Sequence, residues 1–268
     1  EGENMKLKKV MWNIISVLSS VIIIVFVLGI IISIYIVSSG KHIGKSKFAV
    51  QTNAREVFKS SSDVYNLLVM GDSLAKGTGD ENNKGFAGYF ADSLKAKIKK
   101  KVNVNNIAVN GDVSDGLLKI VKRDETSDLI KNANIIFISI GGNEIKKFAS
   151  SAPAAMTVEI KNTEDTYLSN LKNILESIRQ KNSKCKIVFI GLYNPFGSEV
   201  GEDKIKLINE WNYQTQNLIC EDSGTVFVPT YDLFKYNTKT YLTIDNFHPD
   251  SAGYKAIAER IEQLGIEN

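Results

Sequence analysis

Two side chains far apart in the sequence have the types needed for nucleophilic catalysis. Ser73 stands in the segment GDSL, and His248 stands in the segment DNFHP, which begins at Asp245. A serine hydroxyl is a poor nucleophile at neutral pH and needs a base with a pKa of about 7. The chain has two histidines, and the other one, His42, lies in an N-terminal stretch of different composition. His248 is therefore the predicted base, and Asp245 can hold its imidazole in the required tautomer.

The tetrahedral intermediate of acyl transfer also needs hydrogen-bond donors aimed at its oxyanion. The segment GGNE supplies a side-chain amide from Asn143, the segment NGD supplies the backbone N–H of Gly111, and the Ser73 N–H is a third donor. Taken singly, each segment has an ordinary explanation, because Gly-Asp-Ser is a common turn and asparagine often caps a loop. The segment DNFHP could likewise be the start of a helix capped by Asp250 or Ser251. The positions of these segments relative to the secondary structure decide between the two explanations.

Short apolar runs rich in Val and Ile alternate along the chain with longer amphipathic stretches. The runs predicted as strands are residues 65–70, 102–109, 135–140, 186–190 and 225–228. The helical patterns are clearest at residues 86–100, 166–180, 204–219 and 252–264, with Trp211 as a predicted core residue. Strands separated by helices imply a parallel sheet, whose ligands gather at the carboxyl ends of the strands. Ser73, Gly111 and Asn143 closely follow the first three strands, so we expect them to meet at one edge.

In this order, the four segments resemble the sequence blocks of the SGNH hydrolases, also called the GDSL family of lipases and esterases. The resemblance covers about residues 64–264. It implies an α/β fold, a three-layer α/β/α sandwich on a five-stranded parallel sheet, and hydrolysis of carboxylic esters through an acyl-enzyme. We expect no cofactor and no metal. The site residues that it implies are the nucleophile Ser73, the triad partners Asp245 and His248, and the oxyanion donors Ser73, Gly111 and Asn143.

One residue departs from the family pattern. The third block commonly reads Gly-x-Asn-Asp, whereas Glu144 follows Asn143 in this chain. The oxyanion donor is retained, so we expect the change to affect loop packing or the hydrogen bonding around Asn143. Two nearby segments have open interpretations. Residues 144–162 are either a flap over the site or a loop with a short helix, and residues 193–196 either line the acyl pocket or form a turn.

The N-terminal part of the chain differs in composition from the rest. No charged side chain occurs from residue 10 to residue 40, and residues 14–37 are mostly Ile, Val and Leu. A cleavable signal peptide has an apolar region of about 7–15 residues, whereas about 20 apolar residues span a bilayer. Lysines on both flanks leave the orientation undecided by charge, and we expect a single-pass cell-membrane protein with its catalytic domain outside the cytoplasm. The predicted parts are a cytoplasmic N-terminus at 1–9, a transmembrane signal-anchor at 10–40, a stalk at 41–62 and the hydrolase domain at 63–268.

Charge and composition argue against several classes of function. The chain has a net charge of +3, but this charge is unevenly distributed. Residues 1–62 hold eight Lys or Arg and three Glu. The remaining 25 basic and 27 acidic residues give residues 63–268 a net charge of −2. A mildly acidic domain lacks the basic surface of a nucleic-acid binder. Two histidines and two cysteines so far apart in the sequence do not predict a zinc site. Whether Cys185 and Cys220 pair stays open.

The sequence narrows the substrate only to a class. A small acyl ester or a lipid suits a membrane tether, and an O-acetyl group on a cell-envelope glycan suits it equally well. A non-catalytic, membrane-tethered binding domain that keeps the fold is the alternative from another class. A phosphate-binding loop at Gly77 and Gly79 is not predicted, because no Gly-Lys-Ser/Thr follows and no G-x-G-x-x-G opens a helix. We expect these glycines to let the loop pass close to Ser73. The oligomeric state is not indicated.

Overall fold

The computed structural model describes residues 63–148, 157–196 and 201–266, together with the single residues 12, 19 and 23. The chain divides into two units, residues 1–57 and 58–268, and all elements named below belong to the second. Apart from those three single residues, the predicted anchor at 10–40 and the predicted stalk at 41–62 lie outside the described residues. Among the described residues, no helix is both long enough and apolar enough to cross a membrane.

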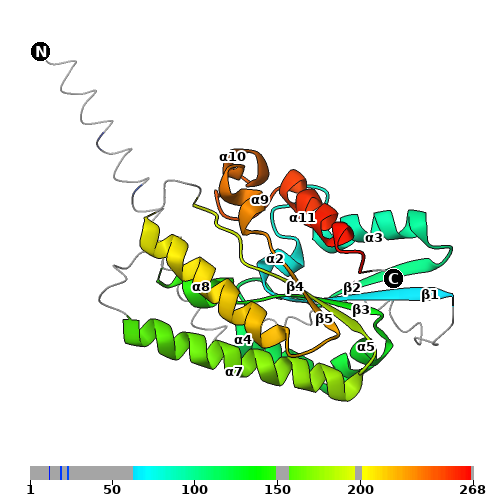
Figure 1. Ribbon diagram of the computed structural model, residues 1–268. Coiled ribbons are helices and arrows are strands. Elements are labelled where there is room, and N and C mark those ends of the chain that lie inside the picture. Colours follow the sequence, from blue (N-terminus) through cyan, green and yellow to red (C-terminus); the bar gives the residue numbers. More distant parts are fainter. Residues whose placement is uncertain are drawn as a thin grey trace, which may run out of the picture. The chain divides into compact units, whose positions relative to one another are not determined.

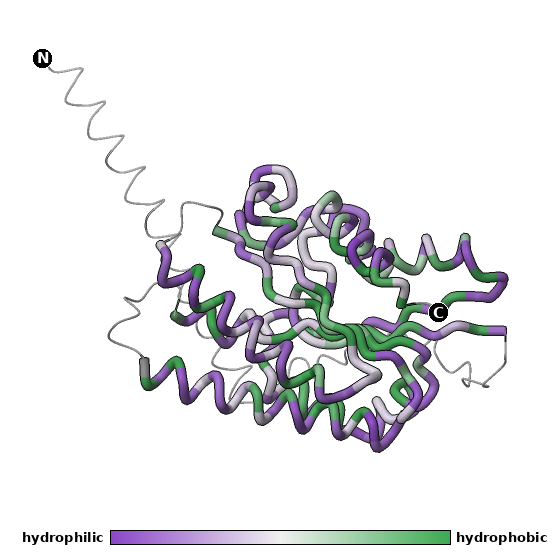
Figure 2. Tube along the Cα trace, in the orientation of Figure 1, coloured by the Kyte–Doolittle hydropathy of each residue, from purple (hydrophilic) through white to green (hydrophobic). Residues whose placement is uncertain are grey.

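Five parallel strands form the central sheet (Figure 1). The strand order is β2-β1-β3-β4-β5, so β1 and β3 are neighbours although β2 lies between them in the sequence. Figure 2 shows the strands as a hydrophobic centre between more polar helices. The parallel five-stranded sheet predicted from the sequence is confirmed. The strands are β1 (Val64–Gly71), β2 (Lys101–Asn106), β3 (Ile135–Ser139), β4 (Lys186–Ile190) and β5 (Thr225–Val228).

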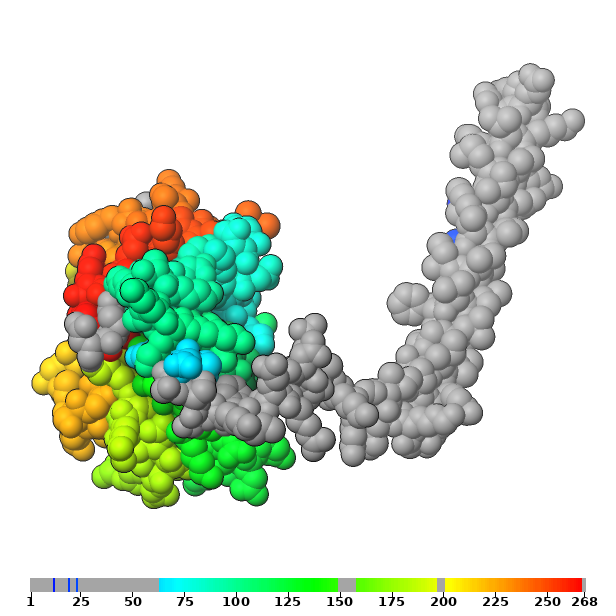
Figure 3. Space-filling view, turned by 90° about the vertical axis from the view of Figure 1, so that its right-hand side faces the viewer, coloured from blue at the N-terminus to red at the C-terminus, as the bar shows by residue number. Residues whose placement is uncertain are grey.

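Helices cover both faces of the sheet and complete three layers (Figure 1). One face carries α3 (Gly85–Lys97) and α11 (Ser251–Gln263), which lie side by side in Figure 3. The other face carries α4 (Ser114–Lys122), α7 (Thr157–Lys181) and α8 (Glu202–Ile219). Shorter helices are α2 (Ser73–Lys76), η1 (Asp124–Thr126), α5 (Ser127–Asn132), α6 (Gly142–Lys146), α9 (Tyr231–Lys235) and α10 (Thr238–Tyr241).

The core consists of two apolar clusters, one on each face of the sheet. Successive residues of a strand point to opposite faces, and Leu67 belongs to the α3 and α11 cluster while Leu68 belongs to the other. In the first cluster, Phe86 on α3 packs edge to face on Phe137 of β3 with ring centroids 5.7 Å apart. In the second, Trp211 is 1% exposed, which confirms that it is a core residue.

Among the longer helices, α4 and α7 differ most from the sequence prediction. Helix α4 was not among the four predicted helices, because it spans only nine residues and its apolar face consists of Leu117, Ile120 and Val121. Helix α7 begins at Thr157, nine residues before the predicted start at 166. The first two turns of α7 are mostly polar and exposed, so they carry little of the apolar periodicity that marks a packed helix.

Candidate active site

Ser73 lies at a sharp turn between β1 and α2. Gly71 before it has a φ of +125°, and a Cβ at this position would lie 1.9 Å from the carbonyl oxygen of Ser139 on β3. Only glycine fits so close to the neighbouring strand. The Asp72 carboxylate then caps α2 by accepting a hydrogen bond from the Leu74 N–H at 3.0 Å. Ser73 thereby becomes the first residue of a helix at the carboxyl end of the sheet, half-buried and within reach of other strand ends.

The structure brings Ser73, His248 and Asp245 together in one hydrogen-bonded row. The His248 Nε2 lies 3.0 Å from the Ser73 Oγ, and the His248 Nδ1 lies 2.6 Å from the Asp245 Oδ2. The other carboxylate oxygen of Asp245 accepts hydrogen bonds from the Thr243 hydroxyl and from the backbone N–H groups of Phe247 and His248. Partial burial raises the pKa of Asp245, but the hydrogen bonds from Thr243 and His248 outweigh it and hold the pKa well below its usual range. Asp245 therefore stays ionised beside the imidazole.

The loop that holds His248 is fixed on both sides. Asp250 caps α11 by accepting from the Gly253 N–H at 2.9 Å, so the predicted start of a helix at this segment is also observed. Before His248, Leu242 pairs with Pro249 in an isolated antiparallel bridge. A Cβ added to Gly79 would lie 2.6 Å from the Pro249 carbonyl oxygen and 3.1 Å from the His248 Cβ. Gly79 thus permits the loop after α2 to pack directly against the histidine segment.

The predicted oxyanion donors lie in different surroundings. The Ser73 N–H and the Gly111 N–H have no hydrogen-bond acceptor within the described part of the chain. The Asn143 side-chain amide donates one N–H to the Asp112 carbonyl oxygen at 2.8 Å, which leaves its second N–H available. Ser73 and Asn143 line the same pocket. Gly111 does not line this pocket. It lies on an exposed turn with a φ of +77°, and the next residue, Asp112, accepts the hydrogen bond from Asn143.

Asp72 is a buried carboxyl group directly beside Ser73, and no role was predicted for it from the sequence. It is 5% exposed and accepts a hydrogen bond from the Ser139 hydroxyl at 3.0 Å in addition to that from Leu74. Burial raises the pKa of Asp72 to about 7, against the lowering effect of these hydrogen bonds. The sequence signal was an aspartate directly between a buried strand and the candidate nucleophile, a position that places its side chain beneath the site.

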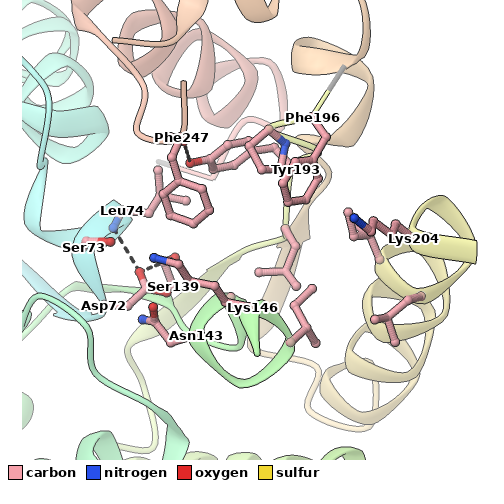
Figure 4. A pocket seen from close by; sticks show the side chains of 16 residues that line it. Asp72, Ser73, Leu74, Ser139, Asn143, Lys146, Tyr193, Phe196, Lys204 and Phe247 are labelled. Atoms are coloured by element: carbon pink, nitrogen blue, oxygen red, sulfur yellow. Dashed lines mark hydrogen bonds between the residues drawn. The ribbon is translucent and has the colours of Figure 1, made fainter. Parts of the chain in front are cut away.

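An apolar pocket opens beside Ser73 (Figure 4). It has a volume of about 80 Å³. In Figure 4, Ser73 and Asn143 lie on one side of the pocket, while Phe196 and Lys204 lie on the other. Most of the wall is hydrophobic, and its apolar residues are Leu74, Ile145, Leu192, Tyr193, Pro195, Phe196, Leu207, Ile208 and Phe247.

The two segments with open interpretations both contribute to this pocket. Tyr193 and Phe196 line it, and the Asn194 side chain also forms a turn by accepting from the Phe196 N–H, so the segment 193–196 does both. Of the segment 144–162, Ile145 on α6 lines the pocket and residues 157–162 begin α7, while residues 149–156 lie outside the described residues.

The structure also describes the side chains that could bind a metal or form a disulfide. Within the described ranges, no group of three or more His, Cys, Asp or Glu side chains could hold a metal ion. Cys185 is buried, Cys220 is exposed, and both are free, so the question of their pairing is answered in the negative.

Comparisons with known proteins agree on one family. Residues 69–256 match the GDSL-like lipase/acylhydrolase family. The uncharacterized protein YpmR of Bacillus subtilis (strain 168) is 34% identical over 203 residues, which cover 74% of this chain and 80% of YpmR. The spore germination lipase LipC of Bacillus licheniformis is 27% identical over 208 residues, which cover 73% of this chain and 94% of LipC.

Solved structures show the same fold. The lipase Lip_vut3 from a goat rumen metagenome has a TM-score of 0.64 at 23% sequence identity, with 75% of this chain and 98% of that chain covered. The acetylxylan esterase Axe2 from Geobacillus stearothermophilus has a TM-score of 0.56 at 17% identity, with 74% and 93% covered. The family match over residues 69–256 and the relative at 34% identity show that this chain belongs to the GDSL-like lipase/acylhydrolase family, and it is a carboxylic ester hydrolase.

Proposed function

We propose that Ser73 is the nucleophile of this hydrolase, with His248 as its base and Asp245 as the partner of the histidine. The observation that carries the proposal is the row of two short contacts, 3.0 Å from Ser73 Oγ to His248 Nε2 and 2.6 Å from His248 Nδ1 to Asp245 Oδ2. A base within hydrogen-bond reach of the nucleophile and itself oriented by a carboxylate is the arrangement that activates a serine hydroxyl.

The reaction proceeds in two halves. The Ser73 Oγ attacks the ester carbonyl carbon while its proton passes to His248 Nε2, and the carbonyl oxygen becomes the oxyanion held by N–H donors. The imidazolium then gives its proton to the leaving alcohol as the ester C–O bond breaks, which leaves an acyl group on Ser73. In the second half, His248 takes a proton from water, the hydroxide attacks the acyl carbon, and the proton returns to Ser73 as the carboxylic acid leaves. The donors are the Ser73 N–H, the Asn143 amide and the Gly111 N–H.

The preferred substrate is an ester with a short to medium acyl chain. The pocket beside Ser73 is mostly apolar and has a volume of about 80 Å³. The pocket therefore has room for more than an acetyl group. The hydrophobic wall favours such a chain over the acetyl group of a glycan, which would leave most of the pocket empty.

A panel of p-nitrophenyl esters from acetate to laurate tests this function. Wild type is expected to show a maximum kcat/KM for a chain longer than acetate, and Ser73→Ala and His248→Ala are expected to lose the activity. Ser177→Ala, at a half-buried serine of α7 that does not line the pocket, is the matched control and should keep it. Equal turnover by wild type and Ser73→Ala would refute the assignment of the nucleophile.

We also propose that residues 10–40 anchor the protein in the cell membrane with the hydrolase domain outside the cytoplasm. The support is the uncharged stretch of the sequence from residue 10 to residue 40. Membrane fractionation followed by protease treatment of intact cells tests it, since an anchored outer domain would pellet with membranes and be digested. Recovery of the full chain in the soluble fraction would contradict it.

A further inference from the structure

Glu144 occupies the position where the chain departs from the family pattern, and its carboxyl group makes a specific contact. The side chain is buried, at 8% exposure. Its Oε1 accepts a hydrogen bond from the Ser114 backbone N–H, with an N···O distance of 2.5 Å. Ser114 is the first residue of α4, where a backbone N–H has no partner within the helix and a negative charge is favourable. The contact therefore joins α6, which carries Asn143, to the start of α4.

The segment that this contact secures is the oxyanion strap, residues 107–113, which leads from β2 to α4. Gly111 lies in the strap, is exposed, and would have nothing within 4 Å of an added Cβ. Its position is therefore set by the attachments on either side rather than by its own packing. Val109 donates its N–H to the Gly71 carbonyl oxygen at 2.8 Å, and the Asp112 carbonyl oxygen accepts from the Asn143 amide at 2.8 Å. The Glu144 contact with Ser114 holds the far end.

Burying this carboxyl group is unfavourable for stability alone. The second oxygen of Glu144, Oε2, has no hydrogen-bond partner in the described part of the chain, and the same holds for Asp112 Oδ2. Burial raises the pKa of Glu144, and the nearby Asp112 raises it further, against hydrogen bonds from Ser114 that lower it. A buried polar atom without a partner costs about 1–3 kcal/mol. Such a cost is typical of a residue kept for function rather than for packing.

We propose that Glu144 is a positioning residue for the oxyanion donors. By holding the Ser114 N–H, it fixes the oxyanion strap relative to α6, so that the Gly111 N–H and the Asn143 amide are directed at the same oxygen. This role rests on the proposed function, in which both groups stabilise the oxyanion. Glu144 does not touch the substrate itself, since it lies on the α7 side of α6, among the residues of a separate polar cavity.

Two substitutions remove the contact from opposite sides. Glu144→Met keeps the side-chain volume and removes the acceptor. Ser114→Pro removes the donor, and proline is tolerated there because it is favoured at the first helical position and Val113 before it is extended, with φ −121° and ψ 169°. Glu144→Gln keeps an acceptor oxygen for the Ser114 N–H and is the conservative rescue. Asp115→Asn, which removes an exposed charge from the same turn of α4, is the matched control.

The measurements are kcat and KM on p-nitrophenyl butyrate, per active site counted with a fluorophosphonate, and the inhibition constant of butylboronic acid. The boronate forms a tetrahedral anion on a serine and so reports on the oxyanion site. Loss of one oxyanion donor typically lowers kcat by about 10²–10³, and for a displaced donor we expect roughly a tenfold to hundredfold loss in Glu144→Met and in Ser114→Pro. The boronate inhibition constant should rise by a similar factor while KM stays within about twofold, because the pocket is unchanged. Glu144→Gln and Asp115→Asn should stay within about threefold of wild type.

The proposal is overturned if Glu144→Met and Ser114→Pro lower only the fraction of folded protein. In that case kcat per titrated site and the affinity for the boronate would equal those of wild type. It is also overturned if Glu144→Gln loses as much as Glu144→Met, because the hydrogen bond would then not be the cause. Neither result affects the assignment of Ser73, which is judged separately by the inactivity of Ser73→Ala.

Discussion

Replacing Asp72 with asparagine should change how the stability of this protein depends on pH. Burial raises the pKa of this carboxyl group from its ordinary value of 3.8 to about 7. The folded chain therefore holds the Asp72 proton in a pH range where the unfolded chain has lost it. Because the native state binds more protons there, the free energy of unfolding falls as pH rises. The stabilisation is fully present below about pH 4 and is lost as pH rises through about 7.

The magnitude follows from the difference between the two pKa values. Each pKa unit corresponds to about 1.4 kcal/mol, so the full loss between the two values is roughly 4 kcal/mol. Between pH 5 and pH 8 the share of this loss is roughly 2–3 kcal/mol. Asparagine keeps an oxygen that can accept from the Leu74 N–H and the Ser139 hydroxyl, and it cannot ionise. The variant should therefore lack this part of the pH dependence.

Urea unfolding of wild type and Asp72→Asn at pH 5 and pH 8 measures the effect. The free energy of unfolding of Asp72→Asn relative to wild type should increase by roughly 2–3 kcal/mol from the lower to the higher pH. All other titrating groups are shared and cancel in this difference. Asp124→Asn, at an exposed aspartate, is the control and should keep a constant difference. If the free energies of unfolding of wild type and Asp72→Asn change equally between pH 5 and pH 8, the pKa of Asp72 is not raised in the folded state and the reasoning is refuted.

Three further substitutions test the surroundings of the site. Asp245→Ala should lower kcat by about a hundredfold with little change in KM, which is a smaller loss than for Ser73→Ala. Steady-state kinetics on p-nitrophenyl butyrate measure both constants. A rise in KM alone would argue against an orienting role for Asp245. Gly79→Ala should lower the free energy of unfolding by about 1–3 kcal/mol and should also lower kcat, because the added Cβ would meet Pro249 and the histidine segment. An unchanged free energy of unfolding would contradict the close packing. Leu207→Trp should fill the pocket and so reduce kcat/KM for the p-nitrophenyl ester of octanoate by about tenfold relative to that of acetate. An unchanged ratio would show that Leu207 does not line the acyl site.

The elements that carry the site were predictable because their signals are local. The central strands β1, β3 and β4 are short apolar runs, and their burial on both faces follows from the parallel arrangement. The carboxyl ends of parallel strands meet at one edge, so the sequence alone predicts that Ser73 and Asn143 approach one another. The need for glycine at position 71 was not predicted, because it comes from the close approach of Gly71 to Ser139 on β3.

The remaining features depend on contacts between distant residues and have no local signature. The raised pKa of Asp72 is due to its burial, and this burial depends on packing against parts of the chain as distant as Ser139, 67 residues away. The bond between Glu144 and Ser114 requires the relative placement of α4 and α6, and the sequence indicated only that hydrogen bonding near Asn143 would differ. The first turns of α7 lack apolar periodicity, so their helical state depends on continuation from the buried part of the helix.

The most direct test of the central claim is the site of covalent labelling by a fluorophosphonate. The account predicts one adduct, located by mass spectrometry on the peptide that contains Ser73. It also predicts that labelling is absent in Ser73→Ala and much slower in His248→Ala, while Ser177→Ala labels like wild type. An active, folded enzyme that carries the label on another residue, or that labels equally well without Ser73, would contradict the claim.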